Sequence, residues 1–171
     1  MKDINNESLT IAIESLHKLV KEIDEKYGGD VSFMTPASRL SIEEFEALIG
    51  WKLPAILKYF LMVESNGLII GNKRIFSLLD KGQKKTFVDN LQRQNNPETS
   101  PWFKQRPHIF DDYLVIGQDG EICFCFSKKY QIDNPSVYIC ENANSSNGVD
   151  FDRLNLDLEG LIRIMIKEEF E

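Results

Sequence analysis

Apolar residues recur at helical spacing near both ends of the chain. Between residues 9 and 27 they lie three or four positions apart, charged residues fill the opposite side, and Gly28-Gly29 follows. This pattern predicts an amphipathic helix that ends at the glycines. Near the other end, the same spacing predicts a helix over residues 156–170, whose buried face consists of Leu158, Leu161, Ile162, Met165 and Ile166.

Two further helices are predicted between residues 41 and 67. Ser41 and Glu44 have the spacing of a capping box, in which both side chains bind free N–H groups at a helix start. Gly50 ends this helix, whose apolar face is Ile42, Phe45, Leu48 and Ile49. Pro54 then lies in the first turn of a third helix, where its missing N–H does no harm. The buried face of that helix is predicted to be Ile56, Leu57, Phe60, Leu61 and Val63.

The middle of the chain carries strand patterns. The strongest is a hairpin in which apolar residues 113–117 and 121–126 flank Gln118-Asp119-Gly120, because Asp-Gly between two apolar runs favours a tight turn. Shorter strands are predicted at 68–70, 74–79 and 137–140, a helix at 81–95, and a loop at 95–107 that carries Trp102 and Phe103.

The order of these elements predicts the fold class. Helices come first, antiparallel strands next and a helix last, which is typical of an α+β domain. We expect a single domain over residues 1–171, with an N-terminal helix in residues 1–30 and a core over 41–170. In that core a central antiparallel or mixed sheet contains the Asp119-Gly120 hairpin, and the C-terminal helix packs on the sheet.

Composition and charge narrow the class of protein. The 171 residues are 42% hydrophobic and 27% charged, which is ordinary for a globular protein. The N-terminus lacks the pattern of a secretory signal, and the longest apolar runs are far shorter than the ~20 residues of a membrane span. Three cysteines, an odd number, then indicate reduced thiols. We therefore expect a cytoplasmic protein with no membrane partner.

The net charge of −7 is unevenly distributed. Residues 81–107 hold six Lys or Arg against two acids, whereas residues 141–171 hold eight acids against three basic residues. The basic stretch lacks the interleaved aromatic residues of single-strand binders, and an acidic chain repels phosphate on average. We therefore expect no direct contact with nucleic acid. The acidic surface instead suits a basic protein, such as a nuclease.

The candidate catalytic and metal-binding residues are few. Neither histidine, His17 nor His108, has a nucleophile nearby in a recognisable motif. Cys123 and Cys125 share one face of a strand and could meet Cys140, but without CxxC spacing they are better interpreted as small buried hydrophobic residues. The acids at the predicted turns do not have EF-hand spacing. The sequence thus predicts no catalytic residue, no metal site and no cofactor.

One segment of the chain carries a pattern specific enough to suggest a protein family. Residues 43–61 followed by Asn66-Gly67 resemble the motif of the SUKH superfamily, which includes the yeast cell-wall-assembly regulator and many bacterial immunity proteins. The motif pairs an acidic helix with Leu-Pro and a second helix. Its positions fall on Phe45, Glu46, Gly50, Leu53, Pro54, Phe60, Leu61, Asn66 and Gly67. Two later segments, 139–141 and 155–159, depart from the family pattern and leave the subgroup open.

The resemblance implies an immunity protein that binds and neutralises a toxin domain, such as a nuclease, by covering it. The motif residues themselves have structural roles, so we expect the contacts to lie in loops. Two aromatic residues and four acids are the candidate contacts: Trp102, Phe103, Asp111, Asp112, Asp119 and Glu121. Each has a plainer interpretation, because Trp102 could fold onto the core and the acids could simply be solvated.

Two other functions stay open at this point. The eukaryotic members of the superfamily suggest a non-enzymatic scaffold or regulatory protein that binds cellular partners. An enzyme with an unrecognised site is the third interpretation, and it requires a polar pocket that holds His17 or His108.

Overall fold

The centre of the protein is a single antiparallel sheet. The computed structural model describes residues 2–79 and 90–171, and within these residues seven strands pair in the order in which they follow along the chain. They are β1 (Val31–Phe33), β2 (Leu68–Ile70), β3 (Lys73–Ile75), β4 (Tyr113–Asp119), β5 (Ile122–Ser127), β6 (Tyr138–Cys140) and β7 (Asp152–Arg153). The sheet is therefore a meander, and the predicted α+β class is confirmed.

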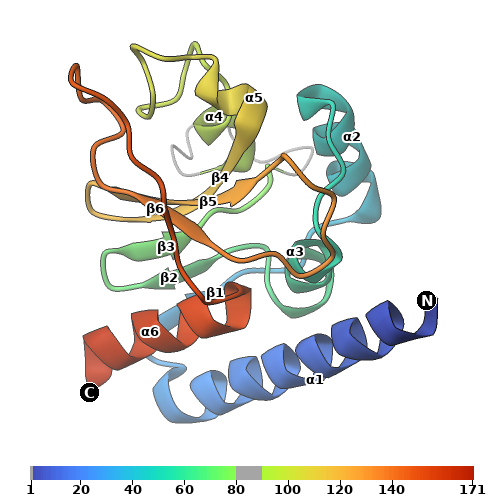
Figure 1. The fold of residues 1–171 in the computed structure, drawn as a ribbon. Helices are drawn as coiled ribbons and strands as arrows, with labels where there is room; N and C mark the ends of the chain where they lie inside the picture. The colour runs from blue at the N-terminus through green and yellow to red at the C-terminus, as the bar shows by residue number, and fades with distance from the viewer. Residues whose placement is uncertain (1, 80–89) are drawn as a thin grey trace.

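Helices surround this sheet on several sides (Figure 1). The two long ones, α1 (Lys2–Tyr27) and α6 (Leu158–Phe170), lie side by side beneath the β1–β2 end of the sheet. The helices α2 (Arg39–Ile49) and α3 (Ala55–Tyr59) lie at the right of the view. Helix α3 continues as a single π-helical turn, η1 (Phe60–Glu64). Two short helices, α4 (Leu91–Gln94) and α5 (Ile109–Asp112), lie near the start of β4.

The first and last helices pack against each other as their apolar patterns predict. Four residues of α1 and all five predicted residues of α6 are buried: Leu16, Leu19, Val20, Ile23, Leu158, Leu161, Ile162, Met165 and Ile166. At the end of this interface the rings of Tyr27 and Phe170 stack with centroids 4.4 Å apart. The carboxylate of Asp157 caps α6 by accepting a hydrogen bond from the Gly160 amide.

The β4–β5 hairpin forms the middle of the core. Its turn lies at Gly120, as predicted, and that glycine has a φ of 57°. Residues 123–126 of β5 are all buried, because one face of the strand carries Cys123 and Cys125 and the other carries Phe124 and Phe126. The prediction that this strand is buried on both faces is confirmed.

Glu46 is the polar centre of the segment between α2 and α3. Its side chain is 4% exposed, and one carboxylate oxygen accepts a hydrogen bond of 2.8 Å from the Leu53 amide. The ammonium groups of Lys52 and Lys58 lie 2.8 and 3.3 Å from the same carboxylate. Gly50 ends α2 with a φ of 64°, so the chain reverses and brings Leu53 back to Glu46.

Asn66 plays a similar role at the end of the motif. Its buried amide donates to the Leu78 carbonyl at 2.9 Å and accepts from the Leu78 amide at 2.7 Å. Gly67, with a φ of 101°, then allows the chain to enter β2. The motif residues therefore bury polar groups that fix two chain reversals, in addition to supplying the apolar core.

Several predicted boundaries are wrong. The N-cap of α2 is Ser38, whose hydroxyl accepts from the Ser41 amide at 3.1 Å, and Ser41 lies inside the helix. Val63 is 55% exposed. The buried face of this helical segment carries Phe60 and Leu61 and continues at Glu64, so Val63 lies on the solvent side.

The strand predicted over 74–79 ends at Ile75. Of the helix predicted over 81–95, residues 81–89 lie outside the described part of the chain, and residues 91–94 are helical. Strands β1 and β7 have no counterpart in the sequence-based prediction.

Replacement of Glu46 tests its role in the fold. We expect Glu46→Ala to lower the free energy of unfolding by about 2–3 kcal/mol, because the buried Leu53 amide loses a charged acceptor. Lys52→Ala is the matched control, and we expect a loss below about 1 kcal/mol since that ammonium is largely exposed. Urea denaturation at pH 7 measures both, and equal losses would contradict the assignment.

The stability conferred by Glu46 should also depend on pH. Burial opposes ionisation, but the hydrogen bonds from Lys52 and Leu53 and the charge of Lys58 outweigh it and lower the pKa of Glu46. A lowered pKa in the folded protein stabilises it above the ordinary value of 4.5, and this contribution is lost as the pH falls below that value. The difference in unfolding free energy between wild type and Glu46→Gln should therefore shrink from pH 6 to pH 3. If the difference in unfolding free energy does not change with pH, the ionised Glu46 carboxylate is not the source of this stability.

Candidate functional site

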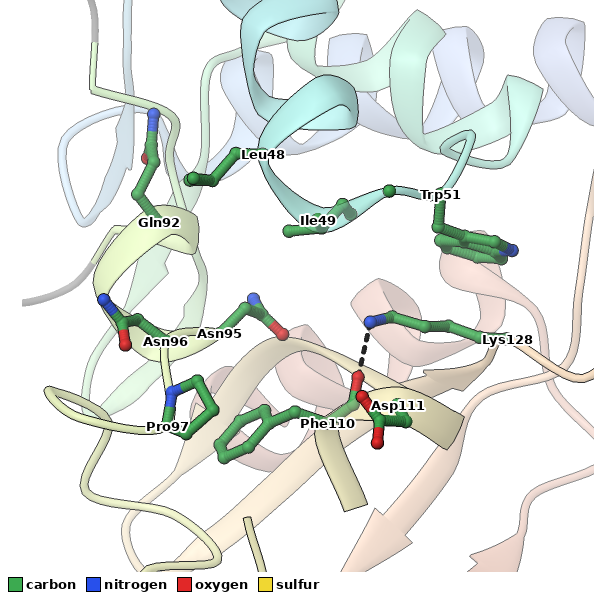
Figure 2. A pocket seen from close by; sticks show the side chains of 11 residues that line it. Leu48, Ile49, Trp51, Gln92, Asn95, Asn96, Pro97, Phe110, Asp111 and Lys128 are labelled. Atoms are coloured by element: carbon green, nitrogen blue, oxygen red, sulfur yellow. Dashed lines mark hydrogen bonds between the residues drawn. The ribbon is translucent and has the colours of Figure 1, made fainter. Parts of the chain in front are cut away.

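A groove of about 490 Å³ lies between the end of α2 and the short helices α4 and α5 (Figure 2). One wall is formed by Leu48 and Ile49 of α2 and by Trp51, which follows the turn at Gly50. The opposite wall comes from residues 92–97 and from Phe110 and Asp111 of α5. The groove therefore joins segments from the two halves of the chain.

Leu48 is the most exposed large apolar side chain among the described residues. Its side chain is 68% exposed, although the helical pattern predicts it on the apolar face of α2. That face is divided, since Ile42 and Phe45 point into the core while Leu48 projects beside the groove. Trp51 is half-buried at the other end of the same wall, beyond Ile49 (Figure 2), and its indole N–H has no hydrogen-bond partner among the residues described.

Among the described residues that line the groove, the one cation is Lys128. The ammonium of Lys128 donates a 2.5 Å hydrogen bond to the Phe110 carbonyl and points into the space between the walls (Figure 2). Burial lowers the pKa of Lys128, and the carboxylates of Asp111 and Asp112 oppose that effect. Neither carboxylate forms an ion pair within 4.0 Å in the described part of the chain.

The walls of the groove are held by buried polar contacts. The Asn95 side chain accepts from the Val115 amide at 2.7 Å and donates to the carbonyls of Val115 and Leu91 at 2.8 and 2.9 Å. On the other side, Glu46 fixes the turn that carries Trp51 through its bonds to Lys52 and Leu53. Both walls are therefore ordered without a ligand.

The four predicted contact acids lie at two opposite ends of the sheet. Asp111 and Asp112 precede β4, whereas Asp119 and Glu121 flank the hairpin turn at the far end of that strand. A strand of this length spans roughly 20 Å, so the two pairs form separate surfaces.

The hairpin turn has acidic neighbours. Cys123 pairs with Cys140 and Ile139 with Asp152, so the end of β6 and the start of β7 lie at the same end of the sheet as the turn. This arrangement adds Glu141, Asp150 and Asp152, all exposed, to Asp119 and Glu121. We call these five residues the acidic sheet end. A shallow depression of about 450 Å³, which Glu121 and Glu141 help to line, lies beside it.

The two predicted aromatic contacts are buried. Trp102 is 6% exposed and its indole N–H donates to the Gln94 side chain at 2.8 Å, while Phe103 is fully buried. The Phe103 ring meets that of Phe110 edge-to-face with centroids 5.5 Å apart. The structure thus favours the plainer interpretation, in which this loop folds onto the core. Phe103 is enclosed by the core, while Trp102 forms part of the lining of the shallow depression beside the acidic sheet end.

The two histidines occupy different surroundings. His17 of α1 is exposed, and its Nδ1 lies 2.7 Å from the buried carboxylate of Glu64, which also accepts a short hydrogen bond from the Tyr59 hydroxyl. Burial, followed by this bond to Glu64, raises the pKa of Tyr59. His108 is exposed at the start of α5. Among the described residues, no hydrogen bond joins either imidazole to a Ser or Cys side chain.

The three cysteines are buried together. The sulfurs of Cys123 and Cys125 are 3.3 Å apart, and Cys140 lies opposite Cys123 on β6. Burial raises the pKa of the Cys125 thiol and raises that of Cys140 to about 11. No group of three or more acidic, His or Cys side chains in the described residues could hold a metal ion. In the same residues, no helix is long and apolar enough to cross a membrane.

The two tryptophans offer a direct test of these positions, since the chain contains no others. We expect Trp51→Phe to remove most of the tryptophan fluorescence that acrylamide can quench, because Trp51 lines the open groove and Trp102 is buried. Trp102→Phe should leave the quenchable fraction in place. Similar quenching in the two variants would contradict the burial of Trp102.

Comparison with known proteins adds the family. A sequence model of the SMI1 / KNR4 family (SUKH-1) matches residues 36–156, and none of the curated proteins matches the chain. The matched span contains all nine motif positions and runs from α2 to β7, while α1, β1 and α6 lie outside it. Because this span covers well over half of the chain, the protein belongs to the SMI1 / KNR4 (SUKH-1) family.

Proposed function

We propose that this protein is an immunity protein that binds a bacterial toxin and neutralises it by covering its active surface. The observation that carries the proposal is membership of a family that includes bacterial immunity proteins. Members of that family bind protein partners, and occlusion requires only a complementary surface. The toxin, and its activity as a nuclease, are part of the proposal.

The charge of the protein supports a basic partner. The net charge is −7, and the fold gathers five acids at the acidic sheet end. Exposed carboxylates of this kind attract a cationic protein over a distance and raise the rate of association. A nuclease that binds nucleic acid presents such a cationic surface, because it must neutralise phosphates.

The proposed contacts are therefore the exposed acids. Asp119 and Glu121 act within the acidic sheet end, and Asp111 and Asp112 act at the edge of the groove. Trp102 and Phe103 instead support the surface from below, since Phe103 packs against Phe110, which precedes Asp111.

Co-expression tests the function. The protein should restore growth to cells that express the toxin domain encoded beside its gene, and the two chains should elute together on size exclusion. A chain that neither rescues growth nor forms a complex would refute the proposal. Capture of housekeeping proteins instead would favour a regulatory role.

The acidic sheet end can be tested in the same system. We expect Asp119→Lys with Glu121→Lys to slow association with the toxin domain about tenfold at low salt, and to have little effect at high salt, because these charges act by steering. Lys18→Glu with Lys21→Glu, on exposed positions of α1, is the control and should not slow association. Stopped-flow or surface-based kinetics at several salt concentrations measures the rates.

A further inference from the structure

We propose that the groove between α2 and the α4–α5 segment is the docking site for a short cationic segment of a protein partner. Apolar side chains of that segment pack against the wall that runs from Leu48 to Trp51, and a Lys or Arg of the same segment binds Asp111 and Asp112. This inference rests on the proposed function, because it assumes a protein partner. It adds the place where the partner docks and the chemistry of the segment that enters.

The apolar wall has the character of a binding surface. Leu48 is 68% exposed, whereas Ile42 and Phe45 of the same helix are buried, so the Leu48 side chain contributes little to the core. Trp51 lines the groove directly after the turn at Gly50. Tryptophan in a partly enclosed pocket is the residue type that most often dominates binding energy at protein interfaces.

The charged side chains at the edge of the groove favour a positively charged segment. Asp111 lines the groove and Asp112 follows it in α5. The charges of both carboxylates act on the Lys128 ammonium, which already donates to the Phe110 carbonyl. Of these three charged side chains in the described part of the chain, two are negative and one is positive, so this edge of the groove favours a cationic group. A cationic side chain completes this arrangement, whereas a phosphate or an acidic peptide would meet two carboxylates.

The size and order of the groove fit a short segment. A volume of about 490 Å³ lies within the range of roughly 300–1,000 Å³ that holds small ligands, so a few side chains fit but not a folded element. Asn95 and Glu46 hold the two walls through buried hydrogen bonds. Binding therefore requires little ordering of the protein itself, which favours affinity.

The first test uses a probe that does not depend on the toxin. Random 12-residue peptides displayed on phage are selected on the wild-type protein, and the enriched peptides are synthesised. We expect Lys or Arg beside an apolar residue in these peptides, and a change in Trp51 fluorescence on binding. Leu48→Glu should weaken their binding about tenfold, as should Asp111→Asn with Asp112→Asn.

Two matched variants control for nonspecific effects. Val63→Glu places the same charge on an exposed apolar position outside the groove, and Glu14→Gln with Glu25→Gln removes two exposed acids of α1. Both should retain wild-type affinity for the peptides. The proposal is overturned if no peptide is enriched, if the enriched peptides are acidic, or if the control variants lose as much affinity as the groove variants.

The second test uses the full-length toxin domain encoded beside the gene. If it binds wild type and Leu48→Glu equally well, the docking site is wrong while the immunity function stands. If it does not bind wild type but cationic peptides bind the groove, the function is wrong and the docking site stands. A dimer of the wild-type protein that Leu48→Glu dissociates would identify a second copy as the occupant and overturn the proposal.

Discussion

The buried carboxylate of Glu46 is the interaction on which much of this structure depends. A charged group inside a protein is costly unless its partners are in place, so the chain between α2 and α3 must adopt the one path that supplies the Leu53 amide and two lysines. That path determines the direction of α3 and the position of Trp51. The same contact that stabilises the core therefore shapes one wall of the groove.

The sequence patterns predicted those elements whose structure depends mainly on residues close together in the sequence. The helices α1 and α6 have long apolar stripes, and the β4–β5 hairpin has a turn sequence that few other structures accommodate. Strands β1 and β7 escaped prediction, because two or three residues carry no period and become strands only through the neighbours that pair with them. The cap of α2 was misplaced by three residues because Ser38 and Ser41 are both good caps.

The candidate functional surface is harder to predict from the sequence, for a physical reason. Leu48 and Trp102 are both apolar, and a sequence does not say which of them a neighbour covers. Trp102 is 6% exposed and donates a hydrogen bond to Gln94, whereas Leu48 lines the open groove and is 68% exposed. Likewise, Asp111 and Asp119 were both candidate contacts, but strand β4 lies between them and places them at opposite ends of the sheet.

The stack of Tyr27 on Phe170 has a consequence for how the protein is made. The first helix emerges from the ribosome long before the last one, and until then the side of α1 that faces α6 is exposed to water. Strand β1 can pair with β2 early, but the burial of α1 is completed only once residue 170 has been synthesised. During that interval the nascent chain carries an uncovered apolar helix, so the closing helix also acts as an internal shield against aggregation.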